Sequence, residues 1–292
     1  MKRLIPAFAL LILCLCPVLA QQDLSKIEIK TTRVAGNVYM LEGAGGNIGA
    51  SVGEDGVLII DDQFAPLADR IRASLKSINP GALKFVLNTH WHGDHTGSNV
   101  IFGKEAIIIA QDNVRLRLMG KPNESGGLSV AKEVLPVITY AQSASVHFNG
   151  EEIKLIHFPK GHTDGDTVIF FTKSKVVHMG DHMMTGKFPF VDYNSGGSVL
   201  GIEKNIGEII KMLPADVKVI PGHGPLATLD DVKAYHKVMV ETIEIVRKQM
   251  AAGKSLDDIK KQGLPDKYND WGTGFIKTGA WIEAIYKGLS VK

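Results

Sequence analysis

Cysteine is almost absent from this sequence. The 292 residues include two, Cys14 and Cys16, and both lie within the first twenty residues. If that segment is removed after export, the rest of the chain offers neither a disulfide bond nor a thiolate ligand for a metal.

The sequence also lacks an excess of charge of either sign. Its 33 basic and 31 acidic residues give a formal net charge of +2, and without Lys2 and Arg3 the two signs balance at 31 each. That balance gives no electrostatic case for nucleic acid or for an anionic membrane surface. We expect a small-molecule substrate, no nucleic-acid partner and no stable membrane association once the first segment is removed.

The first twenty residues have the layout of a secretory signal peptide. A short basic start leads into apolar residues 4–19, and Val18-Leu19-Ala20 supplies small residues for cleavage. An uncleaved membrane anchor is the alternative, but the apolar run is short for a bilayer span and Pro6 and Pro17 interrupt it. A lipoprotein is disfavoured, because each cysteine follows a leucine. We expect residues 1–20 to be a signal peptide and the protein to be secreted or periplasmic.

Residues 21–292 are expected to form one domain. About 45% of the chain is hydrophobic, enough for one large core, and no stretch resembles a linker or a repeat. Short apolar or alternating runs predict strands at residues 27–34, 38–41, 48–52, 57–60, 85–87, 106–110, 153–158, 167–171, 176–178 and 217–220. Apolar residues at helical spacing predict helices at residues 65–78, 113–119, 200–213, 229–250 and 275–289. Because strands and helices alternate in both halves, we expect an α/β fold, a four-layer αββα sandwich of two mixed β-sheets with outer helices.

Histidine and aspartate residues follow directly after several predicted strands. His90 comes after the strand at 85–87, and His162, Asp181 and His223 follow three later strands. Short loops at the ends of rigid strands are how a sheet presents a functional site. Each of these lone histidines, taken by itself, is more often structural than functional.

The most informative string is His90-Trp91-His92-Gly93-Asp94-His95. In an extended segment, residues two apart point to the same side, so His90 and His92 can bind one ion. After the turn at Gly93, Asp94 and His95 can face a second ion. Three histidines and an aspartate within six residues would be costly to desolvate without a metal. Imidazole and carboxylate ligands together suit two Zn²⁺ ions, with Fe or Mn less favoured.

These residues resemble the H-x-H-x-D-H motif of the metallo-β-lactamase superfamily, followed by separate His, Asp and His motifs. The resemblance covers essentially the whole chain after residue 20. It implies that one zinc is held by His90, His92 and His162 and the other by Asp94, His95 and His223. Asp181 would then lie between the two ions.

The resemblance also extends to an early strand that ends in an aspartate, Asp61. It implies that Asp61 supports the ligands from behind. The alternative is a solvated turn carboxylate beside Asp62.

The implied reaction is hydrolysis. Two adjacent zinc ions lower the pKa of a shared water to about 7, which supplies a bridging hydroxide as the nucleophile. Asp94 would be the catalytic side chain, orienting that hydroxide or receiving a proton. The candidate substrates are an ester, a lactone, a thioester or an amide, with β-lactams among them.

The ligand set is similar to that of glyoxalase II and of the acyl-homoserine-lactone lactonases. The cysteine-containing β-lactamases have Cys at the position of Asp181 and often Arg at the position of His95, and this chain has neither. Lys187, between the Asp181 and His223 motifs, is a candidate for binding a substrate carboxylate; the alternative is an exposed loop lysine.

Two other functions stay open. One is a periplasmic metal-binding accessory protein of a sulfur or quinoprotein redox pathway. The other is a di-iron redox protein, although that branch usually replaces one of the first histidines by glutamate.

Overall fold

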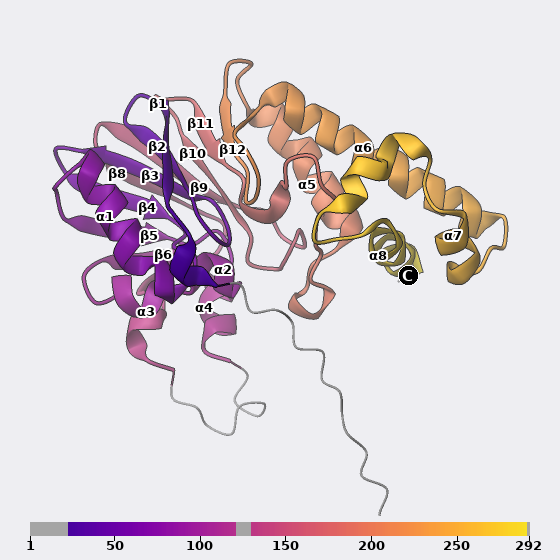
Figure 1. Ribbon diagram of the computed structural model, residues 1–292, viewed down its shortest axis with the longest axis horizontal. Coiled ribbons are helices and arrows are strands. Elements are labelled where there is room, and N and C mark those ends of the chain that lie inside the picture. Colours follow the sequence, from indigo (N-terminus) through magenta and orange to yellow (C-terminus); the bar gives the residue numbers. More distant parts are fainter. Residues whose placement is uncertain (1–22, 121–129, 291–292) are drawn as a thin grey trace, which may run out of the picture.

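Two mixed β-sheets pack face to face, and helices cover both outer faces (Figure 1). This computed structural model describes residues 23–120 and 130–290, so the predicted signal peptide at residues 1–20 lies outside the described residues. The four layers confirm the predicted αββα sandwich.

The first sheet has seven strands in the order β1-β2-β3-β4-β5-β6-β7. Strands β1 to β4 pair antiparallel, and β4 to β7 pair parallel. The bounds are β1 Lys30–Ala35, β2 Val38–Glu42, β3 Ile48–Gly53, β4 Gly56–Ile60, β5 Leu83–Leu87, β6 Ile107–Gln111 and β7 Ile138–Tyr140.

The second sheet has six strands in the order β13-β12-β11-β10-β9-β8. Its β11 and β12 pair parallel, and its other neighbours pair antiparallel. The bounds are β8 Ser143–Phe148, β9 Glu151–His157, β10 Thr167–Phe171, β11 Val176–His178, β12 Lys218–Ile220 and β13 Ala227–Thr228.

Strand β4 shows why the sheets occupy the middle of the molecule. Successive side chains of a strand point to opposite faces. Leu58 and Ile60 therefore join the core between the two sheets, while Val57 and Ile59 join the core beneath helix α1, Ala68–Ile78. All four are buried, so the continuous apolar run reflects a strand that is covered on both sides.

The helices divide between the outer faces: α1 to α4 lie beside the first sheet, and α5 to α8 lie beyond the second (Figure 1). The α-helices are α1 Ala68–Ile78, α2 Gly93–Thr96, α3 Asn99–Phe102, α4 Asp112–Leu118, α5 Val199–Met212, α6 Leu229–Ala251, α7 Leu256–Gln262 and α8 Thr278–Ser290. The 3-10 turns are η1 Leu24–Lys26, η2 Ala65–Leu67, η3 Lys132–Val134, η4 Gly180–His182, η5 Tyr193–Ser195 and η6 Asp266–Thr273. Among the described residues, none of the helices combines the length and the apolar character needed to cross a membrane.

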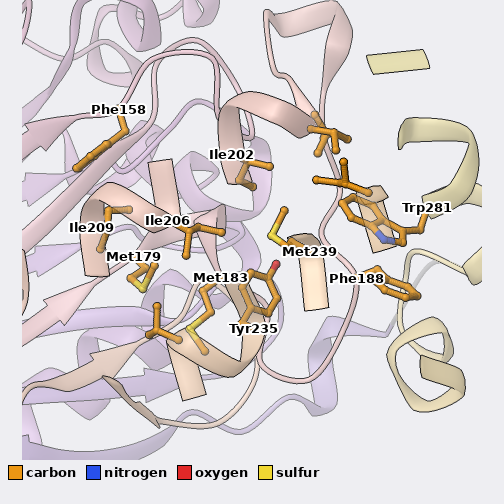
Figure 2. Packing of buried hydrophobic residues seen from close by; sticks show 14 of the residues in the cluster. Phe158, Met179, Met183, Phe188, Ile202, Ile206, Ile209, Tyr235, Met239 and Trp281 are labelled. Atoms are coloured by element: carbon orange, nitrogen blue, oxygen red, sulfur yellow. The ribbon is translucent and has the colours of Figure 1, made fainter. Parts of the chain in front are cut away.

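The outer helices α5, α6 and α8 share a large core with the second sheet (Figure 2). In it, the Trp281 ring stacks on Phe188 with the ring centroids 5.4 Å apart, and the indole Nε1 donates to Thr242 Oγ1 at 3.0 Å. Because Phe188 belongs to the segment that follows η4, this packing ties the C-terminal helix to the loops of the site.

Several elements differ from the prediction. The sequence did not indicate β7, β8, β13 or α7. The helix predicted at residues 275–289 begins at Thr278, because a 3-10 turn runs to Thr273 and an extended Gly274 breaks the helical path. Phe275 consequently lies in a loop.

Candidate metal centre

The loops that carry the candidate ligands leave the same ends of neighbouring strands. Strands β4 and β5 are parallel, so Asp61 and His90 follow adjacent carboxyl ends. Strands β11 and β12 are also parallel, so Asp181 and His223 do the same in the second sheet. Functional groups gather outside the carboxyl ends of such strands. The backbone N–H of Thr167 donates to Thr89 O at 2.8 Å, which joins the two sheets at this edge.

Three imidazole nitrogens form the first group of converging atoms. Nδ1 of His92 lies 3.2 Å from Nε2 of His90 and 2.8 Å from Nε2 of His162. These are the three side chains expected to share one metal, and their geometry allows it.

The second group combines Asp94, His95 and His223. Nε2 of His223 lies 3.3 Å from Nε2 of His95 and 3.4 Å from Oδ2 of Asp94. Single-turn helix α2 begins at Gly93 and carries both Asp94 and His95, so a helical turn stands where the sequence predicted a turn at Gly93.

Asp181 lies between the two groups and presents one oxygen to each. Its Oδ2 is 3.5 Å from Nε2 of His162. Its Oδ1 is 3.2 Å from Nε2 of His95 and 3.3 Å from Nε2 of His223. Oδ1 is buried and has no hydrogen-bond partner in the part of the chain that the structure describes. A buried carboxylate oxygen is costly unless a cation, either a protonated imidazole or a metal ion, lies against it.

The separations fit a metal. Ligand atoms about 2.0–2.1 Å from a tetrahedral zinc ion lie about 3.3 Å from one another. The distances of 3.2 and 3.3 Å match that edge length, and 2.8 Å is somewhat shorter. The side chains therefore converge as ligands do around divalent metal ions.

The hydrogen bonds behind His162 and His92 decide which nitrogens carry lone pairs. Nδ1 of His162 faces the carbonyl of Phe190 at 2.8 Å, and a carbonyl can only accept. Nε2 of His92 faces Oδ2 of Asp192 at 3.0 Å. Each ring thus keeps its proton on the outer nitrogen and presents a lone pair inward. Two lone pairs 2.8 Å apart repel, so the arrangement favours a cation between them.

Asp61 acts in the same way on His90 and His95. Its Oδ2 accepts from Nδ1 of His95 at 2.7 Å and from the hydroxyl of Thr89 at 2.7 Å. Since that hydroxyl donates to Asp61, it accepts from Nδ1 of His90 at 3.0 Å. Asp61 is fully buried at a φ of 61°, so the alternative of a solvated turn carboxylate does not describe it.

Charge and burial set the protonation of the cluster. Burial lowers the pKa of His90 well below its usual range and that of His162 to about 4, so both rings are neutral near pH 7. Burial also disfavours the charged form of His95, but Asp181, Asp61 and Asp94 outweigh it and raise the pKa of His95 well above its usual range. Burial would raise the pKa of Asp181; the nearby His223, His95 and His162 instead hold it well below its usual range.

Two supporting residues were missed in the sequence. Asp192, one hundred positions from His92, holds that ring, and its Oδ1 also accepts the backbone N–H groups of Asn194 and Ser195. The Asp-x-Asn-Ser string indicates an Asx turn, but it does not indicate where the second oxygen points. Asn47 holds the loop of His223, donating from Nδ2 to the carbonyls of Pro221 at 3.0 Å and Gly224 at 2.8 Å.

A cavity of about 910 Å³ opens over the candidate metal centre. Asp94, Asp181 and Lys187 all line it. The ammonium of Lys187 donates to the carbonyl of Asp270 at 3.0 Å and to Oγ1 of Thr273 at 2.5 Å. The contact of Lys187 with a substrate carboxylate stays a prediction.

Solved structures share this fold at low sequence identity. A metallo-beta-lactamase from Pontibacter korlensis superposes with a TM-score of 0.62 at 14% identity, over 73% of this chain and 99% of that chain. A double mutant of a sec-alkyl sulfatase superposes with a TM-score of 0.71 at 15% identity, over 90% of this chain and 50% of that chain. Both likenesses concern the fold.

Curated proteins match part of the sequence. The alpha subunit of a 2,4-dinitroanisole O-demethylase from Nocardioides sp. (strain JS1661) is 26% identical over 54% of this chain and 48% of its own length. An uncharacterized protein from Aquifex aeolicus (strain VF5) is 27% identical over 35% of this chain and 47% of its own length. The chain spans about half the length of these curated relatives. Residues 31–223 match the family model described as the metallo-beta-lactamase superfamily, which places this chain in that superfamily, whose members are generally hydrolases.

Proposed function

We propose that this protein is a zinc-dependent hydrolase with two metal ions that cleaves an ester, a lactone, a thioester or an amide outside the cytoplasm. The observation that carries the proposal is the position of Asp181, whose two oxygens face two separate groups of inward-pointing nitrogens. A carboxylate with a purely structural role would need one group of hydrogen-bond donors, whereas Asp181 lies between two groups of imidazole nitrogens.

The ligand assignment follows the two groups. His90, His92 and His162 would hold one ion, Asp94, His95 and His223 the other, and Asp181 would contact both. Zinc ions bound there would lower the pKa of a bound water to about 7 and polarise the bond under attack. The imidazole and carboxylate donors favour zinc over iron or manganese.

Asp94 is the proposed catalytic side chain. It lines the cavity, and its side chain keeps 30% of its surface exposed, whereas that of Asp181 keeps 5%. A carboxylate that faces both the ligands and the cavity can accept the proton of the attacking water. It can then return that proton to the leaving oxygen, sulfur or nitrogen.

The size of the cavity supports a small-molecule substrate. A volume of about 910 Å³ lies in the range of small-molecule sites. The names of two similar proteins, a 2,4-dinitroanisole O-demethylase subunit and a sec-alkyl sulfatase, refer to small organic molecules. β-Lactams, as cyclic amides, stay among the candidate substrates.

The location outside the cytoplasm depends on the first twenty residues. Their basic start, apolar run and small residues before Gln21 support export. Sequencing the N-terminus of the protein recovered from a periplasmic or culture fraction tests this proposal, and the expected first residue is Gln21.

The activity is tested by metal analysis followed by chromogenic lactone, thioester, phosphodiester and β-lactam substrates. We expect two zinc ions per chain and turnover that a chelator abolishes and added zinc restores. Two bound zinc ions without turnover of any substrate would contradict the hydrolase proposal and favour a metal-binding accessory role.

A further inference from the structure

The lining of the cavity over the metal centre combines candidate ligands with apolar side chains. The candidate ligands include Asp94 and His223. The apolar lining consists of Phe64, Met184, Phe188, Phe190, Pro225 and Phe275. A bond held at the ligands would therefore place its substituent against apolar and aromatic side chains.

Phe275 is the unusual member of this apolar lining. Its surface is 83% exposed, although it is a large hydrophobic residue. Its ring meets Phe190 edge to face, with the centroids 6.1 Å apart at 87°, and Phe190 lies 5.7 Å from the ring of His162. A row of aromatic rings thus leads from a candidate ligand to the mouth of the cavity.

The loop that carries Phe275 is held in place by Lys187. The ammonium of Lys187 donates to Asp270 O and Thr273 Oγ1. Gly274 packs against the stem of the same lysine, since a Cβ at Gly274 would lie 3.1 Å from three of its carbons. Phe275 is therefore presented by an anchored loop, in a part of the chain beyond the residues 31–223 that match the family model.

The apolar lining offers no hydrogen-bond or charge partner to a charged substituent. Apart from the candidate ligands, the charged group among the described lining residues is Lys187, and its ammonium is already bound to the loop. A carboxylate placed among the phenylalanines would lose its hydration without gaining a partner. An uncharged aromatic or aliphatic group would instead cover the exposed ring of Phe275.

We propose that Phe275 and Phe190 form an aromatic surface that selects substrates with an uncharged apolar group beside the bond that is cleaved. This specificity rests on the proposed hydrolase function. Phe275 contributes by contact with the substituent, and Lys187 contributes by holding the loop.

The first test uses the zinc-loaded full chain and two esters of matched length, p-nitrophenyl hexanoate and the mono-p-nitrophenyl ester of adipic acid. We expect kcat/KM to favour the uncharged hexanoate by about tenfold or more, equal to about 1.4 kcal/mol. In Phe275→Ala we expect a rise in KM for the hexanoate of about tenfold, with a smaller effect on p-nitrophenyl acetate. Val137→Ala, at an exposed apolar residue outside the cavity lining, is the control. It should change neither the kcat/KM preference nor the KM for the hexanoate. Equal kcat/KM values for the two esters would overturn the proposal. A higher kcat/KM for the carboxylate ester, with that preference lost in Lys187→Met, would also overturn it.

A second test measures binding to the aromatic surface of Phe275 and Phe190 without requiring hydrolysis. The uncharged fluorophore N-phenyl-1-naphthylamine is titrated into the zinc-loaded wild type and the same variants. About tenfold weaker binding of the fluorophore to Phe275→Ala, with no change in Val137→Ala, supports the proposed aromatic surface even if no ester is hydrolysed. Unchanged binding of the fluorophore to Phe275→Ala overturns the proposed role of the aromatic surface whether or not esters are hydrolysed.

Discussion

Oδ2 of Asp61 lies 2.7 Å from Nδ1 of His95, and both side chains are fully buried. The same oxygen accepts the hydroxyl of Thr89, which in turn accepts from Nδ1 of His90. One carboxylate therefore sets the tautomer and the direction of a candidate ligand in each metal group. Partners of this kind behind metal ligands affect metal affinity strongly.

Asp61→Asn should weaken zinc binding. The amide is neutral, and its nitrogen cannot accept from the His95 ring, so the ligand loses its negative partner. We expect zinc affinity to fall by about 10- to 100-fold in a chelator competition titration. Asp69→Asn is the matched control because the side chain of Asp69 is 95% exposed. Equal affinities for Asp61→Asn and the wild type would contradict this role.

Asp192→Asn should weaken zinc binding at one group of candidate ligands more than at the other. Asn at this position can still accept the backbone N–H groups of the η5 turn, but it removes the negative charge facing Nε2 of His92. We expect the binding isotherm to show one weakened zinc site and one site close to the wild type. Asp230→Asn, at a side chain that is 90% exposed, serves as the control. Simultaneous loss of both sites would show that the effect of Asp192 is not local.

Asp94→Asn should lower turnover more than it lowers stability. The side chain of Asp94 is 30% exposed, so we expect the free energy of unfolding to change by about 1 kcal/mol or less. Loss of a proton acceptor should reduce kcat by about 10²- to 10⁴-fold. The measurement compares kcat with zinc content and a denaturant titration. Wild-type turnover in a zinc-loaded variant would exclude the proposed role.

Zinc affinity should rise with pH. In the metal-free protein, burial opposes the charged forms of His95 and His223, but nearby carboxylates outweigh it and raise both pKa values. These rings hold protons at pH values where an ordinary histidine is neutral, and zinc must displace them. Affinity should therefore increase through the pH range above the usual histidine pKa, by about tenfold per pH unit for each proton released. The stabilising effect of the same groups on the metal-free protein has the opposite sign: it is complete below the usual pKa and is lost as pH rises through the raised value.

Calorimetric titration between pH 6 and pH 9 in buffers of different ionisation enthalpy measures both the affinity and the protons released. Affinity that is constant or falls over this range would show that His95 and His223 are neutral in the metal-free protein.

The fold was largely predictable where local patterns were strong. The apolar run of β4 and the helical spacing of α6 each indicated their element to within a residue or two. Strand β8 was missed because its exposed, alternating face has a weak apolar signal, and α7 because seven residues between Gly253 and Gly263 are too short for a clear period.

Some residues of the candidate site were likewise predictable from the sequence and others were not. The sequence placed His90, Asp181 and His223 after strands. The parallel pairing of β11 and β12 brings Asp181 and His223 together, and the contact between the two sheets at Thr89 and Thr167 brings His90 to the same edge. The sequence did not indicate Asp192 or the exposed ring of Phe275, because each acts through contacts with residues far away in the chain.

The sequence by itself determined which imidazoles and carboxylates are available and at which strand ends they lie, because strand patterns and short motifs are local properties of the chain. Only the tertiary structure decided which nitrogen of each ring points inward, which oxygen of Asp181 faces each group, and that Phe275 stands at the cavity mouth. Those choices depend on hydrogen bonds and packing between segments that are distant in sequence, so no local pattern contains them.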